Sequence, residues 1–153
     1  MIGNIKIIAV CMCKVYDERN YRIIRALNNF AVENDYRLFV YHTCSDLYWK
    51  TLSEKGEQSV FDLIDYNITD AVVTFEEGVY AENVMTKNRM DAAKYGKPVI
   101  SVGVEHDDCI SIKFGYAKGF EQVVRHVIEQ HGVRDIGFIA GRKDEENSEE
   151  RIA

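Results

Sequence analysis

The sequence lacks an excess of basic residues. Its 19 Lys and Arg are outnumbered by 25 Asp and Glu, so that the formal net charge is −6 at pH 7. Proteins that hold the phosphate backbone of nucleic acids do so with clustered Lys and Arg side chains. We therefore expect this chain to make no direct contact with nucleic acid.

Long apolar runs and export signals are missing as well. The first apolar run covers residues 5–12, far short of the roughly 20 residues that a membrane-spanning helix needs. No basic segment and small-residue cleavage site surround it, as a secretory signal requires. Its four cysteines lie in or beside apolar runs, which is typical of reduced thiols in the cytoplasm. We predict a cytoplasmic protein that does not bind membranes.

The common catalytic and cofactor-binding signatures are also absent. The sequence has no Gly-rich dinucleotide or phosphate loop, no Gly-x-Ser-x-Gly elbow and no pair of helical zinc-binding histidines. The nearest approach is the segment 115–119, whose spacing fits neither phosphate loop and which we interpret as a helix start. We expect no cofactor, no metal and no enzymatic activity.

What the chain does have is a regular alternation of two patterns. Short apolar runs rich in β-branched residues alternate with longer stretches in which apolar residues recur every three or four positions. This alternation is typical of an α/β fold, in which helices cover a parallel sheet. The predicted strands are Lys6–Met12, Arg37–Thr43, Ala71–Phe75, Val99–Val104, Cys109–Lys113 and Ile136–Ala140.

Four helices are predicted between these strands. The first carries apolar residues at helical spacing from Tyr21 to Ala31. The others are expected around residues 59–64, 81–93 and 116–130. Gly96 and Pro98 end the third, because Gly permits a left-handed cap and Pro cannot continue a helix. Right-handed crossovers then place the helices on both faces of one doubly wound parallel sheet.

The C-terminal part of the chain carries a family resemblance. Residues 123–141 read Val-Val-Arg-His-Val-Ile-Glu-Gln-His-Gly-Val-Arg-Asp-Ile-Gly-Phe-Ile-Ala-Gly, and Ser148-Glu149-Glu150-Arg151 follows after a polar loop. A helix with His-Val-Ile-x-x-x-Gly, a strand Ile-x-Phe-Ile-x-Gly and a Ser-x-x-Arg helix start resemble the LacI/GalR family of regulators. Upstream, Ile-Thr-Asp-Ala-Val-Val and Tyr-Gly-Lys-Pro-Val-Ile-Ser-Val-Gly are similar to the first lobe of that family's fold, the periplasmic-binding-protein type I fold.

The resemblance implies a small-molecule-sensing and dimerisation domain of a bacterial transcriptional regulator. Residues 1–113 would form the first lobe, and residues 114–153 the crossover helix and first strand of a truncated second lobe. Repressors of this family begin with a helix-turn-helix headpiece, which we expect to be missing because the first predicted strand starts at Lys6. The implied partners are a small-molecule effector, bound between two lobes, and a second copy in a homodimer.

Ligands of open α/β sheets bind beyond the carboxyl ends of the strands, where loops and helix N-termini converge. Carboxylates there can accept hydrogen bonds from the hydroxyl groups of a sugar-like ligand, and an aromatic ring can stack on its apolar face. By this rule the predicted ligand-binding residues are Tyr16, Asp17, Ser45, Asp46, Phe75, Glu76 and Glu105.

Lys113 completes the predicted site. The resemblance implies a ligand-binding Asp shortly after the fifth strand, and this sequence has Lys113 at the matching place. A Lys side chain donates hydrogen bonds where a carboxylate would accept them. The expected effector is therefore either sugar-like or anionic.

Three other functions stay open. The same motifs resemble sensor domains fused ahead of diguanylate cyclase modules. Five alternating strands also occur in receiver and flavodoxin-like modules, although a receiver needs an acidic pair directly after the first strand and an Asp at the end of the third. The last alternative is a small α/β enzyme with an unrecognised site around Asp17, Asp46 and Glu76.

Cysteines on neighbouring predicted strands raise the question of a metal or redox site. Cys11 and Cys13 share one strand face, and His42 and Cys44 lie at the end of the next strand. Two thiols and an imidazole could hold zinc if they met. Buried cysteine is more often a small apolar residue, which is the interpretation we favour.

Overall fold

The structure is a computed structural model, and it describes residues 5–77, 79–141 and 146–152. The chain divides into two compact units, residues 1–113 and 114–153, which are described separately as unit 1 and unit 2. None of the helices in the described part of the chain has the length and hydropathy of a membrane-spanning segment.

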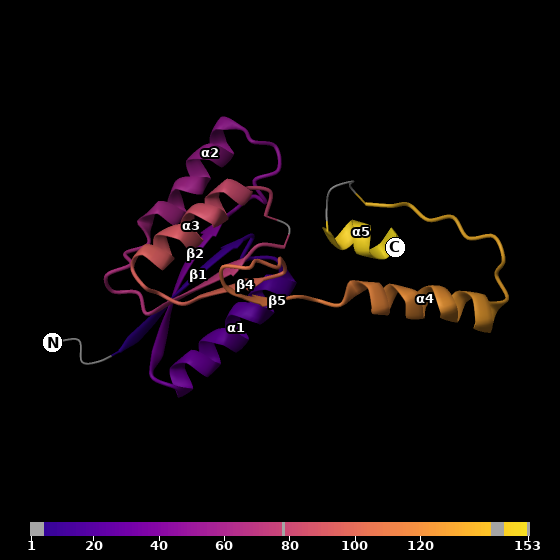
Figure 1. The fold of residues 1–153 in the computed structure, drawn as a ribbon, viewed down its shortest axis with the longest axis horizontal. Helices are drawn as coiled ribbons and strands as arrows, with labels where there is room; N and C mark the ends of the chain where they lie inside the picture. Colours follow the sequence, from indigo (N-terminus) through magenta and orange to yellow (C-terminus); the bar gives the residue numbers. More distant parts are fainter. Residues whose placement is uncertain (1–4, 78, 142–145, 153) are drawn as a thin grey trace. The chain divides into compact units, whose positions relative to one another are not determined.

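Unit 1 is built on one five-stranded sheet in which all neighbouring strands are parallel. Their bounds are β1 Lys6–Cys13, β2 Tyr36–Thr43, β3 Ala71–Phe75, β4 Val99–Val102 and β5 Ile110–Ile112. The strand order is β2-β1-β3-β4-β5. The helix α1 (Glu18–Glu33) lies on one side of the sheet, and α2 (Leu52–Gln58) and α3 (Glu82–Lys94) lie on the other (Figure 1). The predicted doubly wound α/β fold is confirmed.

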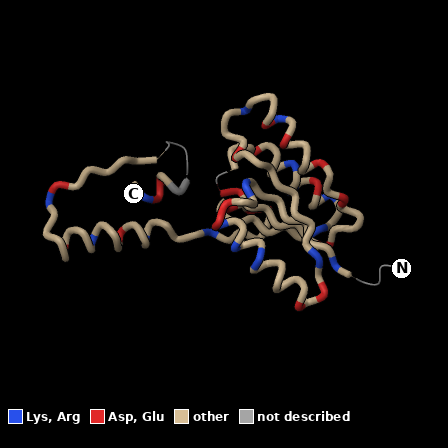
Figure 2. The backbone as a smooth tube through the Cα atoms, turned by 180° about the vertical axis from the view of Figure 1, so that it is seen from behind, with Lys and Arg blue, Asp and Glu red and all other residues tan. Residues whose placement is uncertain are grey.

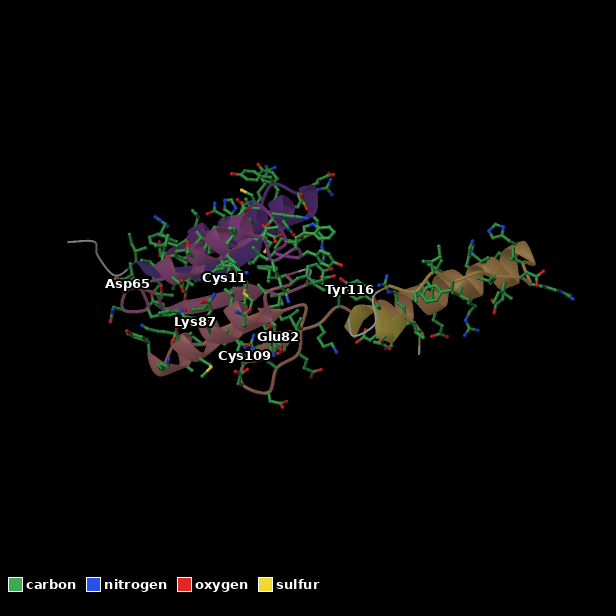
Figure 3. All side chains as sticks on the ribbon, turned by 90° about the horizontal axis from the view of Figure 1, so that it is seen from above. Cys11, Asp65, Glu82, Lys87, Cys109 and Tyr116 are labelled. Atoms are coloured by element: carbon green, nitrogen blue, oxygen red, sulfur yellow. The ribbon has the colours of Figure 1, made fainter. Side chains whose placement is uncertain are left out.

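The main core of unit 1 lies between the sheet and the layer that contains α3. Ala9 of β1 pairs with Val72 of β3, and both are fully buried against Phe61 and Met85 of the helical layer. Cys11 is also fully buried, and Figure 3 shows it in the interior of unit 1. Burial of each large apolar side chain contributes about 1.5–3 kcal/mol. Burial in this layer therefore stabilises the sheet whose strand ends form the carboxyl edge.

The face of the sheet that carries α1 is covered less completely. Val10 and Met12 in the centre of the sheet are buried, at 0% and 1% exposure. In the edge strand β5, Ile110 and Ile112 are 63% and 49% exposed. The central strand β1 is therefore buried on both faces over most of its length, whereas the edge strands β2 and β5 are not.

Capping residues decide where α2 begins. The Thr51 hydroxyl accepts from the Glu54 N–H, and the Glu54 carboxylate accepts from the Thr51 N–H. This capping box starts a helix at Leu52, although the apolar spacing had placed the second helix near Ser59. The predicted segment itself is a 3-10 helix, η1 (Ser59–Leu63).

The described part of unit 2 consists of two helices and the segment 132–141. The helix α4 (Tyr116–His131) ends at Gly132, whose φ of +65° provides the left-handed cap. The second helix is α5 (Glu146–Ile152). The amphipathic pattern of α4 was predicted correctly, yet none of its residues is buried, and Val123 and Ile128 are 59% and 48% exposed.

The predicted strand Ile136–Ala140 is wrong. Residues 132–141 have no regular secondary structure. A strand needs a neighbouring strand for its backbone hydrogen bonds, and the described residues of unit 2 contain no other extended element. Phe138 packs against Phe120 of α4, with 5.0 Å between the ring centroids. The apolar residues of this segment thus contact a helix rather than a sheet.

Gly103 provides a test of the packing at the end of β4. Its φ is +101°, and a Cβ at this position would lie 2.5 Å from the Cβ of Glu77. We expect Gly103→Ala to lower the free energy of unfolding by about 2 kcal/mol or more, since backbone strain alone costs about 1–3 kcal/mol. Urea unfolding followed by circular dichroism measures the change.

Gly56→Ala in α2 is the matched control for that substitution. A Cβ there meets no atom within 4 Å, and Ala in a helix is more stable than Gly by about 0.5–1 kcal/mol. Similar effects of the two substitutions would contradict the packing described at Gly103.

Candidate ligand site at the carboxyl edge of the sheet

All five strands of unit 1 end at one edge of the sheet, because every pair is parallel. The connections on the two sides of the sheet diverge between β1 and β3. In open α/β sheets this switch point is where ligands bind. The loops that follow β1 and β3 flank this switch point, and the loop after the edge strand β2 lies beside the loop after β1.

The loop after β1 presents two exposed side chains. Tyr16 is 78% exposed, and its ring meets His42 edge-on, with 5.4 Å between centroids. Asp17 is exposed and occupies the N-cap position of α1, but its side chain makes no capping hydrogen bond. Both residues predicted here from the sequence thus face solvent at the carboxyl edge.

A salt bridge joins the first two loops. Lys14 Nζ lies 2.8 Å from Asp46 Oδ2, and the Lys14 N–H donates to the Thr43 carbonyl at 2.8 Å. The hydrogen bond from Lys14 lowers the pKa of Asp46, and the same bond raises the pKa of Lys14. The two side chains are 38% and 32% exposed. An ammonium and a carboxylate are thus both within reach of a ligand.

Two glutamates hold the backbone of the loop after β2. Glu57 Oε2 accepts from the Cys44 N–H at 2.8 Å and from the Ser45 N–H and hydroxyl at 3.0 and 3.2 Å. The Glu54 carboxylate accepts from the Trp49 N–H at 3.3 Å. Ser45 is therefore bound to Glu57, and its side chain helps to anchor the loop.

The same loop contains two residues in the left-handed region. Leu47 has a φ of +63° and Lys50 a φ of +54°, and neither is the glycine that normally takes this conformation. Such residues cost of order 1–3 kcal/mol each and cluster at functional sites. Leu47 is fully buried, and the free energy gained by its burial offsets part of this strain. Burial of Leu47 and the hydrogen bonds to the two glutamates thus hold the backbone of this loop in place.

Aromatic side chains that sequence reasoning left out of the predicted site lie on this loop. The Tyr48 ring packs edge-on against Tyr80 and Trp49, at centroid distances of 5.0 and 4.7 Å. Trp49 is 76% exposed. The Tyr80 N–H donates to the Asp46 carbonyl at 3.0 Å, which brings the chain after β3 to the loop after β2. The sequence feature that could have indicated Trp49 as a site residue is its position a few residues after the predicted strand Arg37–Thr43.

Glu76 is placed differently from the other predicted residues. Its side chain is 6% exposed, and both oxygens accept hydrogen bonds from within the protein. Arg89 Nη1 lies 2.8 and 2.9 Å from them, Thr74 Oγ1 donates at 2.8 Å and His106 Nε2 lies at 2.9 Å. Ser101 Oγ is 3.3 Å away. The structure therefore commits this carboxylate to a buried network rather than to the surface.

The remaining predicted residues lie along the same carboxyl edge, at the ends of β3, β4 and β5. Phe75 ends β3 and is half-buried. Glu105 follows β4, and its carboxylate lies 3.4 Å from Lys113 Nζ, directly after β5. The predicted set thus separates into a group at β1 and β2 and a pair at β4 and β5, with the buried Glu76 network between them.

The cysteines do not assemble with His42. Cys13 pairs with Thr43 and Met12 with His42, so that His42 and the two buried thiols of β1 lie on opposite faces of the sheet. Burial raises the pKa of Cys11 to about 12 and that of Cys13 to about 11. Thiols that keep their protons are poor metal ligands and nucleophiles, so a zinc or redox function for this group is not supported.

Two solved repressor structures are similar to this chain. The Escherichia coli transcriptional repressor AscG superimposes with a TM-score of 0.58 at 16% sequence identity, over 96% of this chain and 51% of that chain. The lac repressor dimer bound to operator and the anti-inducer ONPF gives a TM-score of 0.62 at 14% identity, over 98% of this chain and 42% of that one. The chain thus spans about half the length of either repressor.

The likeness establishes the class of fold. No protein-family model matches the sequence, and no curated protein matches it significantly. At this level of sequence identity the two repressors show a shared fold, which is the periplasmic-binding-protein-like α/β fold of LacI-type regulators. It is the fold that the sequence motifs implied.

The Glu76 network offers a test that needs no ligand. We expect Arg89→Met to lower the free energy of unfolding by about 3–5 kcal/mol, because it leaves a buried carboxylate without its countercharge. Arg22→Met, which removes the exposed ion pair with Glu18 on α1, should cost less than about 1 kcal/mol. Urea unfolding compares the two, and equal losses would show that Arg89 does not neutralise Glu76.

Proposed function

We propose that this chain is the small-molecule-sensing domain of a bacterial LacI-type regulator, and that it binds its effector without catalysing a reaction. The proposal rests on the arrangement of side chains where β1 and β2 end at the carboxyl edge. There a salt bridge and exposed aromatic rings lie on loops whose backbone is already held in place. Preorganised polar groups beside aromatic surface are typical of small-ligand sites.

The chemistry of this edge fits a polyhydroxylated or anionic ligand. Asp17 and Asp46 can accept hydrogen bonds from hydroxyl groups, while Lys14 can neutralise an acidic group. Tyr16 and Trp49, at 78% and 76% exposure, offer apolar faces for stacking on a sugar ring. Donors and acceptors lie side by side, so a sugar or a sugar acid matches the site better than an apolar molecule does.

Glu105 and Lys113 form the second part of the proposed site. Their ion pair at 3.4 Å lies at the β4 and β5 ends of the same edge. An effector that contacted both groups would bridge the switch point of the sheet. Phe75 and Ser45 would then line the edge, while Glu76 and Arg89 would support it from below.

Residues 1–113 and 114–153 fit the first lobe and the beginning of the second lobe of such a sensor. The support is the fold likeness, which extends over nearly the whole chain and about half of each repressor. In the sensing mechanism that we propose, the effector favours one arrangement of the lobes by its higher affinity for it, and an attached module responds. We further propose that the regulator is a homodimer.

The receiver-like alternative shares the strand order of this sheet, since β2-β1-β3-β4-β5 is also the order of flavodoxin and receiver modules. A receiver needs an accessible carboxylate at the end of β3. Here that place is taken by Glu76, whose oxygens are bound by Arg89 and its neighbours. Sensing by ligand binding is therefore the better explanation.

Ligand-dependent stability tests the proposal. The purified chain is heated with neutral hexoses and pentoses, hexose phosphates, sugar acids or inorganic phosphate. We expect one of these classes to raise Tm, because a ligand present at 100 times its Kd stabilises the folded state by about 2.7 kcal/mol. Asp46→Asn should weaken that ligand at least tenfold, or about 1.4 kcal/mol.

A matched control separates binding from folding. Glu33→Gln changes a carboxylate at the end of α1, close to where β2 begins and thus at the opposite edge of the sheet, and should leave the affinity unchanged. Asp46→Asn should alter the stability without ligand by less than about 1 kcal/mol, because its salt bridge is partly exposed. If none of the probes raised Tm, or both substitutions weakened binding equally, the proposed site would be wrong.

A further inference from the structure

Two histidines of α4 direct their ring nitrogens toward one another. His126 Nε2 lies 3.2 Å from His131 Nε2. The ring centroids are 5.0 Å apart and the ring planes stand at 76°, so the nitrogens converge and the rings are not stacked. Both side chains are exposed. The pair belongs to unit 2, whereas the residues of the proposed effector site all belong to unit 1.

The distance between the two nitrogens is the distance that a tetrahedral metal ion requires. Zinc binds imidazole nitrogen at about 2.0–2.1 Å, which places two nitrogens of its tetrahedron about 3.3 Å apart. A hydrogen bond between the rings has a similar length. In an exposed position, however, such a bond gains little over hydrogen bonds to water.

The end of the helix adds a second reason for a cation to bind here. His131 is the last residue of α4, and Gly132 caps the helix in the left-handed conformation, its N–H donating to the Ile128 carbonyl at 3.1 Å. The carbonyl end of a helix carries partial negative charge and attracts cations. A single capped helix also holds both ligands, so the site needs no other element to form.

We propose that His126 and His131 bind a divalent transition metal ion such as Zn²⁺, Ni²⁺ or Cu²⁺ through their Nε2 atoms. Imidazole suits these ions, whereas Mg²⁺ and Ca²⁺ prefer oxygen ligands. Within residues 5–77, 79–141 and 146–152, no group of three or more His, Cys, Asp or Glu side chains could hold a metal. Within the described residues the proposed site thus has two protein ligands, and its other coordination positions are open to water or further donors.

The four histidines of the chain make the test internally controlled. Histidine side-chain NMR signals of the full chain are followed while Zn²⁺ is added. We expect the signals of His126 and His131 to shift together and to saturate at one metal ion, or half a metal ion if two chains share it. The signals of His42 and His106 should not move, because the first packs against Tyr16 and the second binds Glu76.

Single substitutions then test whether the two residues act together. His126→Gln and His131→Gln should each weaken Zn²⁺ binding at least tenfold, and Gln130→Ala should leave it unchanged. Far-ultraviolet circular dichroism checks that α4 persists in each variant. Magnesium should produce no shift in the wild-type chain.

Several results would overturn the proposal. One is a shift of His126 and His131 at different metal concentrations, and another is an unchanged affinity in either Gln variant. Earlier saturation of His42 or His106 would place the metal elsewhere. Because the readout is a pair of histidine signals in unit 2, failure here leaves the effector site of unit 1 untouched.

Discussion

A buried carboxylate has to be neutralised, and in this protein Arg89 supplies the charge for Glu76. The pair connects α3 to the end of β3, and Thr74 and His106 bring β3 itself and the loop after β4 into the same network. Burying two charges costs several kcal/mol per ion before their attraction offsets it. The network is therefore better understood as fixing the positions of the strand ends than as a net source of stability.

In the loops beyond the strand ends, some charged residues hold the backbone and others remain accessible to a ligand. Glu54 and Glu57 use their carboxylates on backbone N–H groups and hold the loop after β2. Asp46 and Lys14 keep their charges near the surface. Acidic and basic positions are interspersed over unit 1 (Figure 2), so that recognition there depends on individual placed groups and not on a large field of one sign.

The two units carry their apolar residues in different ways. In unit 1 the central strands and α3 bury theirs, and Ala9 and Met85 have almost no exposed surface. In unit 2 the amphipathic helix α4 exposes Val123 and Ile128, and the following apolar segment forms no strand. Apolar periodicity records which residues can be buried, but burial itself needs a partner surface.

The sequence by itself determined the fold class, the places of five strands and the candidate residues after β1 and β2, because periodicity and turn residues act over a few positions. The tertiary structure decided which of those candidates meet. Glu76 and Asp46 both follow strands of the same sheet, yet Glu76 is buried in an ion pair with Arg89 while Asp46 stays near the surface in an ion pair with Lys14. The tertiary structure also provides no neighbouring strand for Ile136–Ala140 among the described residues, so this segment does not form a strand. Each outcome depends on a residue distant in the chain, and local patterns carry no information about such pairings.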